Sequence, residues 1–169
     1  DVTATVDSIP LIASSIMSKK IASGADIILI DIKVGRGALI KTKKDAKELS
    51  YWMKEIGKKY NKKVVTIITD MNIPLSNSIG NRLEVEEAMK VLYGEKTRLY
   101  EVSKEIASIL ISLAKKITID EAKEMVDLSI KTGSAYKKFL EFIKYQGGNI
   151  NDLKIISVEK INKKSIENE

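Results

Sequence analysis

The chain has 169 residues, of which 44% are hydrophobic and 31% charged, with a formal net charge of +6. This length and composition are those of one ordinary domain with a hydrophobic core, which argues against disorder of the whole chain. Cysteine and histidine are both absent. Their absence excludes disulfides, thiolate metal sites and cysteine nucleophiles, and it leaves no side chain with an unperturbed pKa near neutrality.

The distribution of apolar and charged residues argues against two classes of partner. The longest apolar run, residues 106–114, is shorter than the roughly 18 residues of a membrane span. Lysines are spread among glutamates rather than gathered with aromatic side chains, which favours a solvated surface over a nucleic-acid-binding face. We therefore expect a cytoplasmic protein with neither partner. Because the chain starts at Asp1 without a signal-like segment, we expect it to begin inside a longer protein.

The chain opens with the pattern of a helix followed by a strand. Asp7–Ser8 with Pro10 nearby is typical of a helix start with a capping side chain. This helix is expected to run to about Ala22, and Gly24 to end it. Residues 25–32 form a short β-branched apolar run, which predicts a strand buried on both faces.

A second helix and strand are expected next. After a glycine-rich turn at 35–38, Thr42 is expected to cap a helix that runs to about Tyr60, and residues 64–68 predict another buried strand. A loop over residues 69–80 follows. This order predicts an α/β fold with a parallel sheet and crossover helices, in which ligands bind at the carboxyl ends of the strands.

The remaining sequence predicts a helical segment. Apolar residues recur at helical spacing in four stretches, residues 83–92, 100–115, 119–130 and 134–145. The final stretch, 149–169, is rich in lysine and asparagine and has a weak alternating patch at 153–158. We expect it to be the start of a strand with a loose tail.

The first predicted helix carries an unusual face. Residues three and four apart share a face of a helix, so Ile12, Ser15 and Lys19 form one stripe, with Ile9 and Ile16 beside it. A stripe of isoleucines with a hydroxyl and an ammonium suits a pocket for a flat ring with polar atoms on its rim. From spacing alone, the simpler interpretation is a solvated Lys19 and a boundary Ser15.

Residues 1–20, DVTATVDSIPLIASSIMSKK, closely resemble the segment that carries the base-binding helix of thymidine and pyrimidine-nucleoside phosphorylases. The resemblance continues in order through residues 31–38, 68–72, 80–85 and 146–148. It implies an internal segment of such an enzyme, truncated at both ends. Residues 1–23 would belong to the family's small α domain and 24–148 to its large α/β domain, while 149–169 would begin a C-terminal region or form a loose tail.

The resemblance implies reversible phosphorolysis, in which phosphate displaces the base of a pyrimidine nucleoside to give free base and a pentose 1-phosphate. Ser15 and Lys19 match the family's base-binding serine and lysine. Donors aimed at the ring oxygens would stabilise the negative charge that the base gains as it leaves, and these two residues are the expected catalytic pair. Ile12 and Leu39 match side chains that pack on the ring, and Leu39 replaces the phenylalanine common in bacterial members.

The resemblance also implies a monovalent-cation site, for potassium, and no organic cofactor. Its ligands would include the backbone carbonyls of Leu75 and Ser78 and the carboxylate of Glu87. Hard oxygen ligands suit such an ion. Glu84 and Glu86 lie close by, so an equally simple reading is that these acidic residues stabilise a helix N-terminus.

Several alternatives stay open. The family's phosphate-binding segment and a base-binding arginine would precede Asp1, so we expect this chain alone to be inactive and the full-length enzyme to be a homodimer that binds nucleoside and phosphate. A non-catalytic remnant or association fragment is one alternative, and a related phosphoribosyltransferase is another, although its diphosphate signatures are not found. A dinucleotide site at Gly35 and Gly37 fails, because the third glycine of that motif would fall at Ile40.

Overall fold

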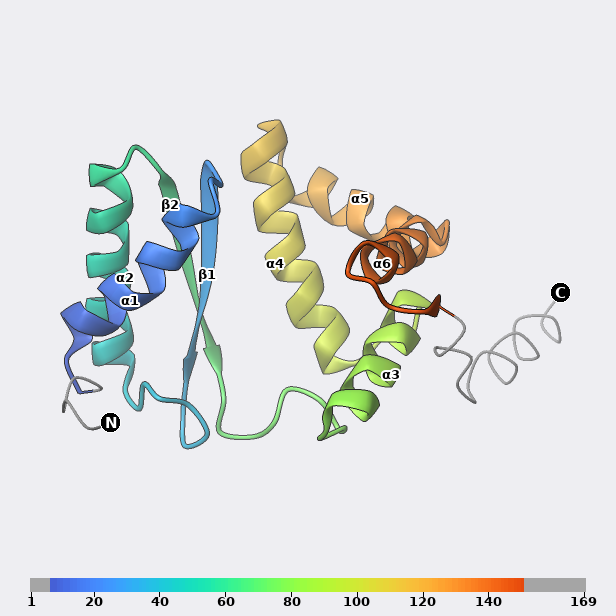
Figure 1. Cartoon of the computed structure of the whole chain (residues 1–169), viewed down its shortest axis with the longest axis horizontal. Helices are drawn as coiled ribbons and strands as arrows, with labels where there is room; N and C mark the ends of the chain where they lie inside the picture. Colours follow the sequence, from blue (N-terminus) through green and yellow to red (C-terminus); the bar gives the residue numbers. More distant parts are fainter. Residues whose placement is uncertain (1–6, 151–169) are drawn as a thin grey trace, which may run out of the picture. The chain divides into compact units, whose positions relative to one another are not determined.

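The computed structural model describes residues 7–150, in which two parallel strands and six helices follow one another along the chain (Figure 1). This confirms the predicted α/β class with a helical second half. Residues 1–6, and the predicted strand start and tail beyond residue 150, lie outside the described residues. The elements are α1 (Ile9–Ala22), β1 (Ile27–Val34), α2 (Lys43–Lys59), β2 (Lys63–Asp70), α3 (Asn81–Leu92), α4 (Arg98–Lys115), α5 (Ile119–Lys131) and α6 (Ser134–Tyr145).

The described residues form two compact units. Unit 1 contains residues 7–75 and 109–116, and unit 2 contains residues 76–108 and 117–150, so α4 contributes to both. Within unit 1, α1 packs with α2 and the strands. The assignment of residues 1–23 and 24–148 to different domains of a larger enzyme stays a prediction.

Unit 1 is built on the parallel pair β1–β2, with Ile28 opposite Val64 and Ile32 opposite Ile68. Helix α2 is the crossover that a parallel connection requires. Helices α1 and α2 pack on the strand face that carries Ile28 and Ile32, and the core of unit 1 lies between these helices and the strands. Its buried members are Ala13, Met17, Ile28, Ile32, Ile40, Ala46, Leu49 and Met53.

The helix boundaries follow local signals with one exception. Thr42 caps α2 as predicted, since its hydroxyl accepts a hydrogen bond from the Asp45 amide at 3.1 Å. Gly24 follows α1 with a φ of +80°, as expected of a glycine stop. The predicted capping by Ser8 is wrong: Ser8 occupies the N-cap position, but its side chain makes no capping bond. Pro10 lacks the N–H that a cap could bind at the second helical position.

Both strands are less buried than predicted, β1 is shifted by two residues from the predicted 25–32, and β2 is longer than the predicted 64–68. Each has eight residues, and only Ile28 and Ile32 are buried among them. The expectation of burial on both faces is therefore wrong for the described residues, because α1 and α2 cover the face of these two isoleucines. Polar side chains lie on the other face: the Lys33 ammonium is 2.6 Å from an Asp31 carboxylate oxygen and donates to the Thr69 hydroxyl at 2.9 Å.

Unit 2 contains the helices predicted from apolar periodicity, and each begins within two residues of the expected start. Helix α6 packs against α3 and α5. A capping box begins α5, in which the Thr118 hydroxyl and the Glu121 carboxylate each accept a bond from the other residue's backbone amide. Across the described part of the chain, no helix is both long and apolar enough to span a membrane.

Candidate functional site

Two adjoining cavities in unit 1 bring together residues that are distant in sequence. Ile12 of α1 and Leu39 of the loop after β1 line both of them, with Ile40. Their volumes are about 280 and 210 Å³, below the roughly 300–1,000 Å³ typical of whole ligand pockets. We call the two cavities together the slot. Cavities of this size suit one ring of a ligand better than a complete nucleoside.

The two cavities differ in their surroundings. Charged groups, Asp7, Lys41 and Asp45, reach the rim of the larger one. The smaller one is walled by α1, β1 and α2, with Ile16 and Met53 among its lining residues. Asp31 and Lys33 also line the smaller cavity, so the slot has mostly apolar lining residues with charged groups in both parts. Apolar walls with a few polar groups are the arrangement that binds a flat heterocycle by its faces.

Ser15 and Lys19 lie on the same helix as Ile12 and Ile16, and both are exposed. Neither is among the residues that line the two cavities. Within residues 7–150, no side-chain hydrogen bond or ion pair engages the Ser15 hydroxyl or the Lys19 ammonium. Packed aliphatic side chains do not enclose them, so both groups are free to meet a ligand. Their role toward a base stays a prediction.

The turn that presents Leu39 is held by its own backbone. The Gly35 amide donates to the Ile40 carbonyl at 3.2 Å, the Ala38 amide donates to the Gly35 carbonyl at 3.1 Å, and Ile40 forms a bridge with Val34. Ile40 is 8% exposed and joins the core, whereas Leu39 is 59% exposed. The turn thus anchors one side chain in the core and directs its neighbour toward the cavity.

Glu87, a predicted cation ligand, is 8% exposed and anchors the loop before α3. Its carboxylate accepts bonds from the amides of Asn77 at 3.4 Å and Ser78 at 3.0 Å. The Ser78 hydroxyl and these amides keep the pKa of Glu87 below its usual value, against the opposing effect of burial, so the group is ionised. Sequence analysis missed this loop-anchoring role, because the donors belong to the backbone.

The donor chemistry around Glu87 is compatible with a monovalent cation. An ionised carboxylate and the neighbouring Ser78 carbonyl offer hard oxygen atoms, although that carbonyl already accepts a bond from the Ser76 hydroxyl at 2.9 Å. Leu75 is half-buried and is the last residue of unit 1 before the chain enters unit 2. Glu84 accepts a bond from the Gly80 amide at 3.1 Å and so serves the N-terminus of α3, as the simpler reading of these acidic residues expected.

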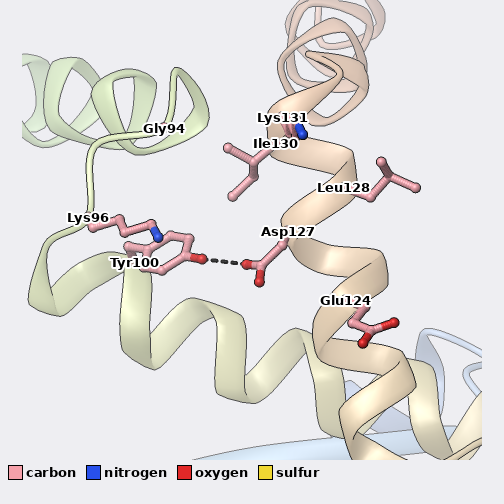
Figure 2. Close-up of a pocket in the computed structure, with 8 residues that line it drawn as sticks. All are labelled: Gly94, Lys96, Tyr100, Glu124, Asp127, Leu128, Ile130 and Lys131. Atoms are coloured by element: carbon pink, nitrogen blue, oxygen red, sulfur yellow. Dashed lines mark hydrogen bonds between the residues drawn. The ribbon is translucent and has the colours of Figure 1, made fainter.

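A larger cavity of about 440 Å³ lies in unit 2, between the chain at Gly94–Tyr100 and helix α5 (Figure 2). Sequence analysis assigned no role to its lining residues. The buried Tyr100 hydroxyl donates to Asp127 at 2.5 Å, and Lys104 donates to the other oxygen of the same carboxylate at 2.7 Å. Lys104 and Tyr100 lower the pKa of Asp127. The polar groups of this wall bond to one another, so we assign them a role in the stability of unit 2.

The amino-acid sequence is similar to those of known proteins over most of its length. The chain is 50% identical over 151 residues to the pyrimidine-nucleoside phosphorylase of Bacillus subtilis, covering 88% of this chain and 35% of that protein. It is 48% identical over 163 residues to the protein of that name from Staphylococcus epidermidis, covering 95% and 37%. It is 50% identical over 152 residues to the thymidine phosphorylase of Metamycoplasma hominis, covering 89% and 56%.

The chain thus spans between about a third and just over half of the length of these curated relatives. The predicted resemblance to pyrimidine-nucleoside and thymidine phosphorylases is confirmed. A family model described as "Glycosyl transferase family, a/b domain" also matches residues 1–136, most of the sequence. The chain therefore belongs to this glycosyl transferase family.

Proposed function

We propose that this chain provides the base-binding part of an enzyme that phosphorolyses pyrimidine nucleosides. A phosphate oxygen forms a bond to the anomeric carbon of the pentose, and the glycosidic C–N bond breaks. The base leaves with the bonding electrons and is protonated, and a pentose 1-phosphate remains. The observation that carries this proposal is the 48–50% identity, over most of this chain, to proteins with that name.

The cavities of unit 1 support the assignment of the base site. Ile12 and Leu39, which come from α1 and from the loop after β1, line one ring-sized slot. In the proposal, the pyrimidine ring lies between these two side chains. Such apolar contact holds the substrate and the departing base about equally well, so it contributes to binding more than to the rate.

Ser15 and Lys19 are the proposed donors to the ring oxygens of the base. Both are exposed on α1, on the turns next to Ile12 and Ile16. As the glycosidic bond breaks, the base gains negative charge, and an ammonium beside the ring stabilises that charge more than it stabilises the neutral ring. Lys19 therefore has the larger proposed effect on the rate, and Ser15 orients the ring.

The remaining proposals concern partners. We infer that the full-length protein works in the cytoplasm as a homodimer and takes phosphate as its second substrate. We also infer a potassium ion bound by the carboxylate of Glu87 and the carbonyl oxygens of Leu75 and Ser78. The ionised state of the buried Glu87 supports this inference.

The test is phosphorolysis by the full-length protein with Lys19→Ala, and Lys20→Ala is the matched control. Both lysines are exposed neighbours on α1, but they point about 100° apart around the helix. We expect Lys19→Ala to lower kcat for uridine or thymidine by about 10²- to 10³-fold, as removal of one transition-state donor does, and Lys20→Ala to have little effect. Equal rates for the two variants would remove Lys19 from the mechanism. The alternative of a non-catalytic protein predicts no phosphorolysis even without a substitution.

A further inference from the structure

The loops that leave β1 and β2 are bonded to each other at the carboxyl ends of the strands. The Gly37 amide donates to the Met71 carbonyl at 3.0 Å, and the Arg36 amide donates to the side-chain oxygen of Asn72 at 3.1 Å. The Asn72 side chain is itself fixed, because its amide group donates to Asp70 at 2.5 Å. We call residues 35–37 and 71–72 the loop clasp. It joins two segments that are 36 positions apart in the chain.

Backbone packs directly on backbone within the loop clasp. Gly35 has a φ of +143°, and a Cβ atom there would lie 2.7 Å from the Asn72 nitrogen and from the Met71 carbonyl carbon. A Cβ atom on Gly37 would lie 2.9 Å from the Met71 carbonyl oxygen. These distances are too short for a side chain, so the two glycines permit the close approach that the hydrogen bonds need.

The loop clasp determines where Leu39 lies. Residues 36 and 37 are held by the β2 loop, and Ile40 is held by the core and by its carbonyl bond to the Gly35 amide. Leu39 lies between these two attachments and reaches the cavity that it shares with Ile12. With both sides of a short turn fixed, its backbone has little freedom to carry Leu39 away from the slot.

We propose that Asn72 is a positioning residue for the base slot, acting through the Arg36–Gly37 backbone on Leu39. This inference rests on the proposed function, because it assumes that the slot holds the base. Asn72 itself touches no substrate in the proposal. Its loss loosens the turn, and part of the binding energy is then spent on ordering Leu39.

The experiment is a double-mutant cycle in the full-length protein with Asn72→Ala, Leu39→Ala and the combined variant. We expect Asn72→Ala to raise the KM for the nucleoside about fivefold, the factor that corresponds to one ordinary hydrogen bond, and to leave the KM for phosphate unchanged. In the Leu39→Ala background, the same substitution should change the nucleoside KM less than twofold, because the side chain through which Asn72 acts is gone. Asn81→Ala, at an exposed asparagine of α3, is the control and should change neither constant.

Gly37→Ala perturbs the loop clasp from the other side and should reproduce the selective rise in nucleoside KM. Equal effects of Asn72→Ala with and without Leu39, or an equal rise in both KM values, would overturn the positioning role while leaving the proposed function intact. Absence of turnover in the unsubstituted protein would instead overturn the proposed function. Thermal unfolding of every variant shows whether a KM change comes from a loss of folded protein.

Discussion

Gly57 lies where α2 crosses β2, and replacing it by alanine sets two effects of opposite sign against each other. Alanine is favoured over glycine inside a helix by about 1 kcal/mol. At Gly57, however, the added Cβ would lie 2.2 Å from a methyl carbon of Val64 and 3.2 Å from its Cβ. Ordinary contacts between carbon atoms lie at roughly 3.5–4.0 Å, so helix and strand must separate or Val64 must leave its position.

The steric effect should win. Overpacking typically costs about 1–3 kcal/mol, and a value in the upper half applies here because a valine side chain is stiff and has few rotamers to escape into. The helix preference offsets only part of this, since Gly57 is two residues from the end of α2. We expect Gly57→Ala to lower the free energy of unfolding by about 1–2 kcal/mol.

Urea denaturation followed by tryptophan fluorescence measures this change. Trp52, the only tryptophan, lies on α2 and reports on unit 1. The matched background is Val64→Ala, which removes the methyl group that the new Cβ would meet. In that background Gly57→Ala should cost clearly less or become stabilising. Equal destabilisation in both backgrounds, or a more stable single variant, would refute the packing argument.

Three further predictions address the slot and the two polar anchors of unit 2. Leu39→Phe should fill part of the slot and shift the ratio of kcat/KM for thymidine over uridine downward by up to about tenfold; an unchanged ratio would mean that Leu39 does not touch the base. The Ser78 hydroxyl and the amides of residues 77 and 78 hold the pKa of Glu87 below its usual value, so its stabilisation is fully present above the unfolded-state pKa and is lost as the pH falls through the folded value. Glu87→Gln should therefore flatten the acid limb of a plot of unfolding free energy against pH, and identical limbs would contradict this. Tyr100→Phe should cost about 1–2 kcal/mol in urea unfolding, because it removes one donor to the Asp127 carboxylate, and a neutral result would show that Lys104 alone suffices.

The sequence by itself determined the elements of this fold. The start signal Asp7–Ser8–Pro10 predicted the first helix, and apolar residues at helical spacing predicted the other five described helices. β-branched runs predicted both strands, and Thr42 and Gly24 marked two boundaries. These inferences succeed because each depends on neighbours within one element. The predicted capping by Ser8 was wrong, since its side chain makes no capping bond.

Only the tertiary structure decided what those elements enclose. The parallel register of β1 and β2 brings their two loops into contact, and no periodicity in either loop predicts that Gly35 and Gly37 pack on residues 71–72. The backbone donors of Glu87 are likewise set by how the chain packs. The family resemblance had already implied that Ile12 and Leu39 serve one site, and the structure shows the cavity that they share. A sequence pattern records which side of an element is apolar, whereas the partner of that side is chosen by packing across many intervening residues.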